Sequence, residues 1–350
     1  MNYIGSKLSL LEFIENSITK VAGDVENCIF CDLFAGTGAV GLHFKKLGCK
    51  VISNDIQYYS FVLNRHYIGN HKPLLFENLF EIIPQLELVP IDERKSIVCN
   101  FLNSIDEYEG FIYKNYCPND KSERQYFTKE NGKMCDAIRE KIEIWYDENK
   151  INGDEYFFLL ATLLENIDKK ANTASVYGAY LKGYKNSAKQ NLQYQPLPLF
   201  INDKEHEIYN TDANELINSI KPDIIYLDPP YNARQYATNY HILETIAKND
   251  NPQISGKTGL RNYSKQKSKY CFKATVKKEF AELIKNAKAK YIFLSYNNEG
   301  LLSFDDIKEI MSSRGEYGFF ERSYSRFKAD NNREYKTNFT TEYLHYVKVR

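Results

Sequence analysis

The spacing of apolar residues predicts an α/β unit near the start of the chain. Residues 28–34 form an apolar run that ends in Asp-Leu-Phe, and a glycine-rich turn follows it. The next residues, to Leu47, carry apolar side chains at helical spacing, so the pattern indicates a strand, a turn and a helix. A second short strand over 51–53 leads to Asp55 and a further helix. This alternation is typical of an open sheet with helices on its faces.

The pattern changes in the middle of the chain. Residues 71–204 contain long amphipathic segments, including 133–146 and 155–167, and lack the alternation of strand, turn and helix. We therefore expect a mainly helical inserted domain over 71–204, within an α/β domain made of residues 1–70 and 205–350.

The α/β alternation returns after the insert. A buried run over 224–227 stops at two prolines, which end a strand. The last two candidate strands are predicted to be antiparallel, so we expect a mostly parallel sheet with a terminal antiparallel hairpin. The predicted strands are 207–210, 224–227, 291–295, 317–325 and 342–349, and the predicted helices are 238–248 and 274–288.

Composition excludes several classes of protein. The chain has 350 residues, of which 43% are hydrophobic and 26% are charged, as in globular proteins. The longest apolar run, Phe157 to Leu164, is too short to cross a bilayer, and the N-terminus does not resemble a signal peptide. We expect a cytoplasmic protein with no membrane segment. The cysteines number seven, and Cys28 and Cys31 have no neighbouring pair, so we expect reduced thiols and no metal site.

The charge is zero in total but uneven along the chain. Residues 169–200 contain five lysines and no acidic residue, and residues 257–273 contain six basic residues and no acidic residue. Tyrosines lie among these lysines, and such a mixture suits phosphates and bases. The candidate phosphate contacts are Lys182, Lys185, Lys189, Arg261, Lys265 and Lys267.

Three predicted strands end in polar residues. These ends are residues 32–38, 54–55 and 228–231. Ligands of open α/β sheets bind beyond the carboxyl ends of the strands. The glycines of the first end also fit G-x-G-x-x-G, with Asp55 19 residues after Gly36, so a dinucleotide site is one interpretation. Asp32 is less suited to a pyrophosphate than to a ligand that carries an ammonium group.

The third strand end, Asp228-Pro-Pro-Tyr231, resembles the D-P-P-Y motif of enzymes that methylate exocyclic amines of nucleic-acid bases. The other motifs of the resemblance are residues 3–7, residues 32–38, Asp55 and Asp212. Together with them, the chain resembles the D12 class of adenine-N6 DNA methyltransferases with the Dam-like motif order of the alpha group. The resemblance covers about 1–70 and 205–350. Segments 232–245 and 256–261 are similar to members of type II restriction-modification systems. The family resemblance implies a Rossmann-like class I methyltransferase sheet and a target-recognition domain in the insert.

The resemblance also implies a site. The catalytic residues would be Asp228, Pro229, Pro230 and Tyr231. The donor, S-adenosylmethionine, would contact Tyr3, Lys7, Asp32, Phe34, Ala35, Gly36, Thr37, Gly38, Asp55, Asp212 and Asp228. Lys7 would contact the methionyl carboxylate and Asp55 the ribose. Ala213 follows Asp212 where the family often has an aromatic residue, and Asn297 could reach the site from the strand at 291–295.

The chemistry of an adenine amine explains the catalytic motif. Its lone pair is delocalised into the ring, so acceptors for both amino hydrogens are needed to make the nitrogen nucleophilic. The Asp228 carboxylate and the Pro229 carbonyl can supply them, and Tyr231 can stack on the flipped base.

Other functions remain open at this stage. Methylation of cytosine N4 or of adenine in RNA uses the same motif. A nicotinamide-dependent oxidoreductase could use the glycine turn, and a DNA-binding regulator could use the basic patches alone. C5-cytosine methylation is excluded because it needs a cysteine after a proline, and the chain has no such dipeptide.

The favoured hypothesis is a methyltransferase that acts on double-stranded DNA. By resemblance, it would protect host DNA against a restriction endonuclease encoded nearby, without forming a stable complex with it.

Overall fold

The computed structural model describes residues 3–325 and 339–350, which form two compact units. One unit contains Gly5–Asn64, Lys204–Tyr236 and Ser264–Arg350, and we refer to it as the sheet unit. The other contains Met1–Ile4, Arg65–Asp203 and Ala237–Tyr263, and we refer to it as the helical unit. Residues 237–263, which the sequence analysis assigned to the α/β domain, therefore cluster with the helical unit.

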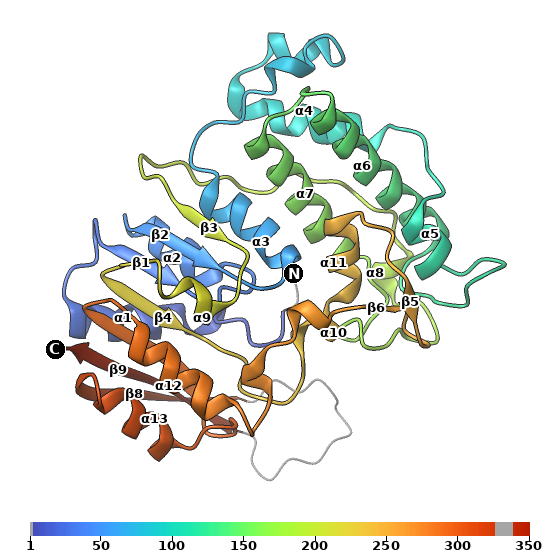
Figure 1. Ribbon diagram of the computed structural model, residues 1–350. Helices are drawn as coiled ribbons and strands as arrows, with labels where there is room; N and C mark the ends of the chain where they lie inside the picture. Colours follow the sequence, from blue (N-terminus) through green and yellow to red (C-terminus); the bar gives the residue numbers. More distant parts are fainter. Residues whose placement is uncertain (1–2, 326–338) are drawn as a thin grey trace. The chain divides into compact units, whose positions relative to one another are not determined.

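The sheet unit contains a seven-stranded sheet in the order β3-β2-β1-β4-β7-β9-β8 (Figure 1). Neighbouring strands from β3 to β7 are parallel, whereas β9 is antiparallel to both β7 and β8. The predicted mostly parallel α/β sheet with a terminal antiparallel hairpin is confirmed. The strands are β1 (Ile29–Asp32), β2 (Lys50–Asn54), β3 (Glu207–Tyr209), β4 (Ile224–Leu227), β7 (Tyr291–Asn297), β8 (Gly315–Ser325) and β9 (Phe339–Val349).

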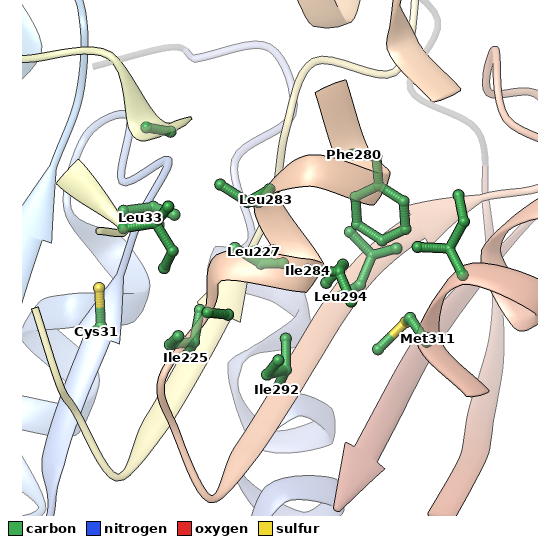
Figure 2. Close-up of a cluster of buried hydrophobic side chains, with 14 of the residues drawn as sticks. Cys31, Leu33, Ile225, Leu227, Phe280, Leu283, Ile284, Ile292, Leu294 and Met311 are labelled. Carbon is green, nitrogen blue, oxygen red and sulfur yellow. The ribbon is translucent and has the colours of Figure 1, made fainter. Parts of the chain in front are cut away.

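Apolar side chains alternate between the two faces of this sheet. On one face, Cys31, Ile225, Ile292 and Leu294 contribute to a buried cluster with residues of three helices (Figure 2). Those helices are α9 (Ala213–Leu216), α12 (Val276–Asn286) and α13 (Phe304–Ser312). Because side chains alternate along a strand, the sequence of β1 and β4 supplies apolar groups to both faces.

The opposite face packs on the N-terminal helices. Phe30 of β1 stacks on Phe44 at a centroid distance of 3.9 Å and on Tyr226 of β4 at 6.4 Å. Lys20 lies 5.4 Å from the ring centroid of Phe320. The helices of this part are α1 (Leu11–Ala22), α2 (Ala39–Lys46) and α3 (Tyr58–Asn64).

The helical unit confirms the mainly helical nature of the insert. The capping box of Asn152 and Glu155 begins its apolar helix α7, and Thr128 caps α6. The predicted helix at 238–248 is instead two helices, which meet at the buried Tyr240. The elements are α4 (Ile91–Asn103), α5 (Phe111–Tyr116), α6 (Lys129–Asp147), α7 (Gly153–Asp168), α8 (Asn186–Lys189), α10 (Tyr236–Asn239), α11 (His241–Lys248), β5 (Ile254–Ser255) and β6 (Leu260–Arg261).

Three further features of the described residues concern membrane-spanning helices, metal ligands and cysteines. No helix in 3–325 or 339–350 is long and apolar enough to span a bilayer. Within the same ranges, no group of three or more metal-ligating side chains is found. All seven cysteines are free thiols, and Cys31 is buried in β1.

Candidate active site

The glycine turn after β1 joins two adjacent strand ends. Gly36 and Gly38 have φ angles of 53° and 79°, values that side chains with a Cβ rarely adopt. The Gly36 N–H donates to Asp55 Oδ2 at 2.9 Å, so the residue that follows β2 fixes the turn that follows β1. Asn64 Nδ2 donates to the Gly36 carbonyl at 3.0 Å from the other side. These hydrogen bonds therefore fix the conformation of the turn at the carboxyl edge of the sheet.

Asp32 is the last residue of β1 and is almost completely buried, with 1% of its surface exposed. Its Oδ2 accepts the Gly41 N–H at 3.1 Å, whereas its Oδ1 has no hydrogen-bond partner among the described residues. The pKa of this carboxyl is raised to about 8, mainly by burial and also by the charges of Asp228 and Asp55, while the Gly41 hydrogen bond opposes the rise. A cation placed at Oδ1 would relieve this unfavourable state.

The second part of the site follows β4. Asp228-Pro-Pro-Tyr231 begins directly after the buried strand, and β4 lies next to β1. The pKa of Asp228 is raised to about 6, because burial and the Glu342 charge raise it by more than the Lys7 ammonium lowers it. The Leu301 N–H donates to the Tyr231 carbonyl at 3.0 Å, and the Tyr231 ring meets Tyr296 edge-on at 6.1 Å. The last residue of the candidate catalytic motif therefore has contacts to β7 and to the segment that follows it.

Lys7 joins Asp228 to the C-terminal hairpin. Its Nζ lies 3.2 Å from Asp228 Oδ1 and 2.7 Å from Glu342 Oε1. Ser295 Oγ donates to the same Glu342 oxygen at 2.6 Å. Burial disfavours the charged ammonium, but the two carboxylates nevertheless raise the pKa of Lys7 well above its ordinary value. Lys7 and Glu342 are buried and Asp228 is half-buried, so one buried ammonium lies between two carboxyl groups.

Sequence reasoning missed Glu342 and Ser295. Glu342 is 1% exposed and begins a stretch of β9 that is otherwise rich in aromatic and aliphatic residues. An acidic residue in such a strand was the available signal, because a buried carboxylate needs a partner. Its partner Lys7 is 335 residues away in the sequence, and only the fold brings the two together.

The remaining residues assigned to the donor lie in different surroundings. Phe34 contacts Tyr270 edge-on at 5.2 Å, and Ala35 donates its N–H to the Asn54 carbonyl at 2.9 Å. Thr37 is half-buried in the glycine turn. Asp212 caps α9 by accepting the Asn214 N–H at 2.8 Å.

Tyr3 and Asn297 have contacts of their own. Tyr3 belongs to the helical unit, where it stacks on Tyr240 at 4.9 Å. The side-chain oxygen of Asn297, at the end of β7, accepts the Glu299 N–H at 3.0 Å. Their contacts to a donor or a base remain predictions.

The candidate phosphate contacts divide between the two units. Lys182, Lys185 and Lys189 belong to the helical unit, and Lys265 and Lys267 belong to the sheet unit. All are exposed or half-buried. Arg261 differs from them because it is 6% exposed and its guanidinium binds both Asp250 oxygens, at 3.0 and 2.5 Å.

The geometry thus places the buried carboxylate of Asp32 at the end of β1 and the carboxylate of Asp228 directly after the neighbouring parallel strand β4. Comparison with known proteins defines the class of enzyme. The family model of D12 class N6 adenine-specific DNA methyltransferases matches residues 3–310. The chain belongs to this family.

Three relatives support this membership. The chain is 51% identical over 348 residues to the type II methyltransferase M.NlaIII of Neisseria lactamica, covering 99% of this chain and 98% of the relative. It is 36% identical over 351 residues to the type II methyltransferase M.CviAII of Paramecium bursaria Chlorella virus 1, covering 100% and 98%. It is 39% identical over 350 residues to the type II methyltransferase M.FokI of Planomicrobium okeanokoites, covering 99% of this chain and 52% of that protein. The chain spans about half the length of M.FokI.

Family membership identifies the protein as an adenine-specific DNA methyltransferase. Its substrate is DNA, and its reaction requires a methyl donor. The predicted enzyme class is confirmed, and the oxidoreductase and regulator alternatives are excluded as the main function.

Proposed function

We propose that the protein transfers the methyl group of S-adenosylmethionine to N6 of adenine in a short duplex sequence. The observation that carries the proposal is the position of Asp228. Asp32 is in register with Tyr226 of the buried strand β4, and Asp228 follows Tyr226 by two residues, so the two carboxylates lie at neighbouring strand ends. The donor is a cation with an ammonium group, and it suits this pair of carboxylates better than a pyrophosphate does.

The residues at the first two strand ends fit S-adenosylmethionine. The buried and unpartnered Oδ1 of Asp32 would accept its ammonium group. Asp55 already accepts the Gly36 and Gln57 N–H groups, at 2.9 and 2.8 Å. Each carboxylate oxygen has a second lone pair, so Asp55 would also accept the ribose hydroxyls. When bound, the donor supplies a methyl carbon that its sulfonium makes electrophilic.

The residues of the third strand end would activate the adenine amine. The Asp228 carboxylate would accept one amino hydrogen and the Pro229 carbonyl the other. No described residue donates a hydrogen bond to the Pro229 oxygen. With both hydrogens held, the nitrogen lone pair would form a bond to the methyl carbon as the carbon–sulfur bond broke, and the amino proton held by Asp228 would pass to that carboxylate. The half-buried Tyr231 would stack on the flipped base.

The lysines of the two units would contact DNA phosphates. We retain Lys182, Lys185, Lys189, Lys265 and Lys267 for this role. Arg261 is left out because its guanidinium already has a carboxylate partner. Phosphate contacts set affinity and register but do not read the sequence.

The proposed biological role is protection of host DNA. The protein would be the modification half of a type II system, and a cognate endonuclease would be encoded nearby without a stable complex. Long-read sequencing of DNA from cells that carry the gene would identify the methylated sequence. The absence of a sequence motif that is consistently methylated would refute this role.

Purified protein tests the reaction itself. The protein is incubated with duplex DNA and S-adenosylmethionine, and the nucleosides are measured by mass spectrometry. We expect N6-methyldeoxyadenosine from the wild type and from the exposed control Asp203→Asn, and none from Asp228→Asn. N4-methyldeoxycytidine, or equal activity of Asp228→Asn, would contradict the proposal.

A further inference from the structure

The turn between β5 and β6 in the helical unit has an unusual set of contacts. Four consecutive carbonyl oxygens, those of residues 256–259, each lie within hydrogen-bond distance of a side-chain nitrogen or hydroxyl. The pairs are Arg124 Nη2 to Gly256 at 3.0 Å, Arg124 Nε to Lys257 at 3.0 Å, His241 Nε2 to Thr258 at 3.1 Å and Tyr116 OH to Gly259 at 2.8 Å. A turn of four residues thus has all of its backbone acceptors directed at one set of side chains.

These side chains are themselves fixed. Arg124 Nη1 donates to the Asn115 carbonyl at 3.0 Å. Tyr116 and His241 are both buried, and their rings meet edge-on at 6.2 Å. A Cβ on Gly259, whose φ is +67°, would lie 2.8 Å from the Tyr116 ring. The close approach therefore requires glycine, and the conformation of the turn is set before any ligand binds.

The backbone N–H groups of the same turn differ from one another, and that of Gly259 donates to the Gly256 carbonyl at 3.2 Å. The N–H groups of Lys257 and Thr258 form no hydrogen bond with the described residues. The Lys257 side chain is exposed. The nearest acidic residue in the sequence, Asp250, is bound by the guanidinium of Arg261. The turn therefore offers two backbone donors and a positive charge, while its acceptors are all engaged.

We propose that the turn at 256–259 binds a phosphate of the DNA backbone. Lys257 supplies the ammonium, the backbone N–H groups of Lys257 and Thr258 supply further donors, and Arg124 is the positioning residue that holds their peptide groups. A phosphate oxygen accepts hydrogen bonds and donates none, so it complements a surface of donors. Because the partner is DNA, this inference rests on the proposed function.

The decisive measurement is the salt dependence of DNA binding. Fluorescence anisotropy with a labelled duplex gives the association constant of the full-length protein at several salt concentrations. Each phosphate contact contributes about 0.9 to the slope of log K against log salt. We expect Lys257→Gln to lower the slope by about 0.9 and to weaken binding severalfold. The matched control Lys72→Gln, an exposed lysine elsewhere in the same unit, should leave the slope unchanged.

A second variant tests the positioning role. Arg124→Gln should lower the salt slope by the same amount as Lys257→Gln. The slope of the double variant should be no lower than that of either single variant. A thermal melt reports whether Arg124→Gln remains folded. If that variant does not fold, the Lys257→Gln slope still decides whether the turn binds phosphate.

The outcomes separate this inference from the proposed function. An unchanged slope for Lys257→Gln, in a wild type that methylates DNA, would overturn the inference alone. If Lys257→Gln weakens binding only to the duplex that carries the methylated sequence, the turn contacts bases and the phosphate assignment is overturned. A wild type that binds DNA but forms no methylated base would refute the proposed function and leave the salt test valid.

Discussion

Replacing Lys7 with methionine should shift the pH range in which the enzyme works. Asp228 accepts an amino hydrogen most strongly as a carboxylate, so activity should rise with pH through its pKa of about 6. The Lys7 ammonium lowers that pKa, and the variant removes this effect. The acid limb of the pH profile should therefore move to higher pH.

The contact distance gives the size of the shift. At 3.2 Å between Lys7 Nζ and Asp228 Oδ1, an effective dielectric constant of about 20 gives an attraction of about 5 kcal/mol. This is an upper bound, because Lys7 also pairs with Glu342 at 2.7 Å. Opposite charges at such distances commonly shift a pKa by about 1–3 units. A shift of about two units would lower the ionised fraction at pH 7 from about nine tenths to about one tenth.

The assay is single-turnover methyl transfer from pH 5.5 to 9.5 with saturating donor and DNA. At pH 7, the methyl-transfer rate of Lys7→Met should be about tenfold below that of the wild type. At pH 9, most of this difference should disappear. Glu342→Gln should move the acid limb the other way, because the Glu342 charge raises the pKa of Asp228. Lys20→Met, an exposed lysine in the same unit, is the control for the general loss of a cation.

One result would refute this reasoning. If Lys7→Met loses the same factor at every pH and the KM for S-adenosylmethionine rises, Lys7 acts on the donor. That outcome would favour the contact with the methionyl carboxylate that the family resemblance implies.

The remaining predictions concern the donor site and the DNA contacts. Asp32→Asn should abolish donor binding in calorimetry but raise the Tm of the free protein, by an amount that grows from about pH 4 to pH 8, because folding raises the pKa of Asp32 to about 8 and ionisation over this range opposes folding. Gly38→Ala should destabilise the glycine turn by about 1 kcal/mol and weaken donor binding, because Gly38 has a φ of 79°; unchanged affinity would contradict the role of the turn. Tyr231→Ala should weaken binding of duplexes with a flipped base by about 1–3 kcal/mol, and Tyr231→Phe should retain most of it. Lys189→Gln should lower the salt slope by about 0.9 with kcat unchanged.

The sheet could be predicted from the sequence because its signals are local. The apolar run that ends at Asp32 and the run that ends at Leu227 each stop at turn residues, and both became central parallel strands. The same local patterns brought the three polar strand ends to one edge of the sheet. The charges of Asp55 and Asp228 act on Asp32 because β2 and β4 both lie beside β1, and this order of strands was not predicted from the sequence.

The parts that could not be predicted depend on contacts between distant segments. Nothing near Lys7 in the sequence indicates that Glu342 is its partner. Arg261 lies in a basic stretch, and only the fold shows that Asp250 neutralises it. The break at Tyr240, between α10 and α11, could not be predicted either, because residues 236–248 contain no glycine or proline.

The central claim is that the carboxylate of Asp228 activates the amino group of adenine. The most direct test measures methylated nucleosides in duplex DNA after reaction with the wild type and with Asp228→Asn, which retains the shape of the side chain but not its charge. The account predicts N6-methyldeoxyadenosine only from the wild type, with both proteins binding the donor and DNA. Comparable amounts of N6-methyldeoxyadenosine from the two proteins would contradict it.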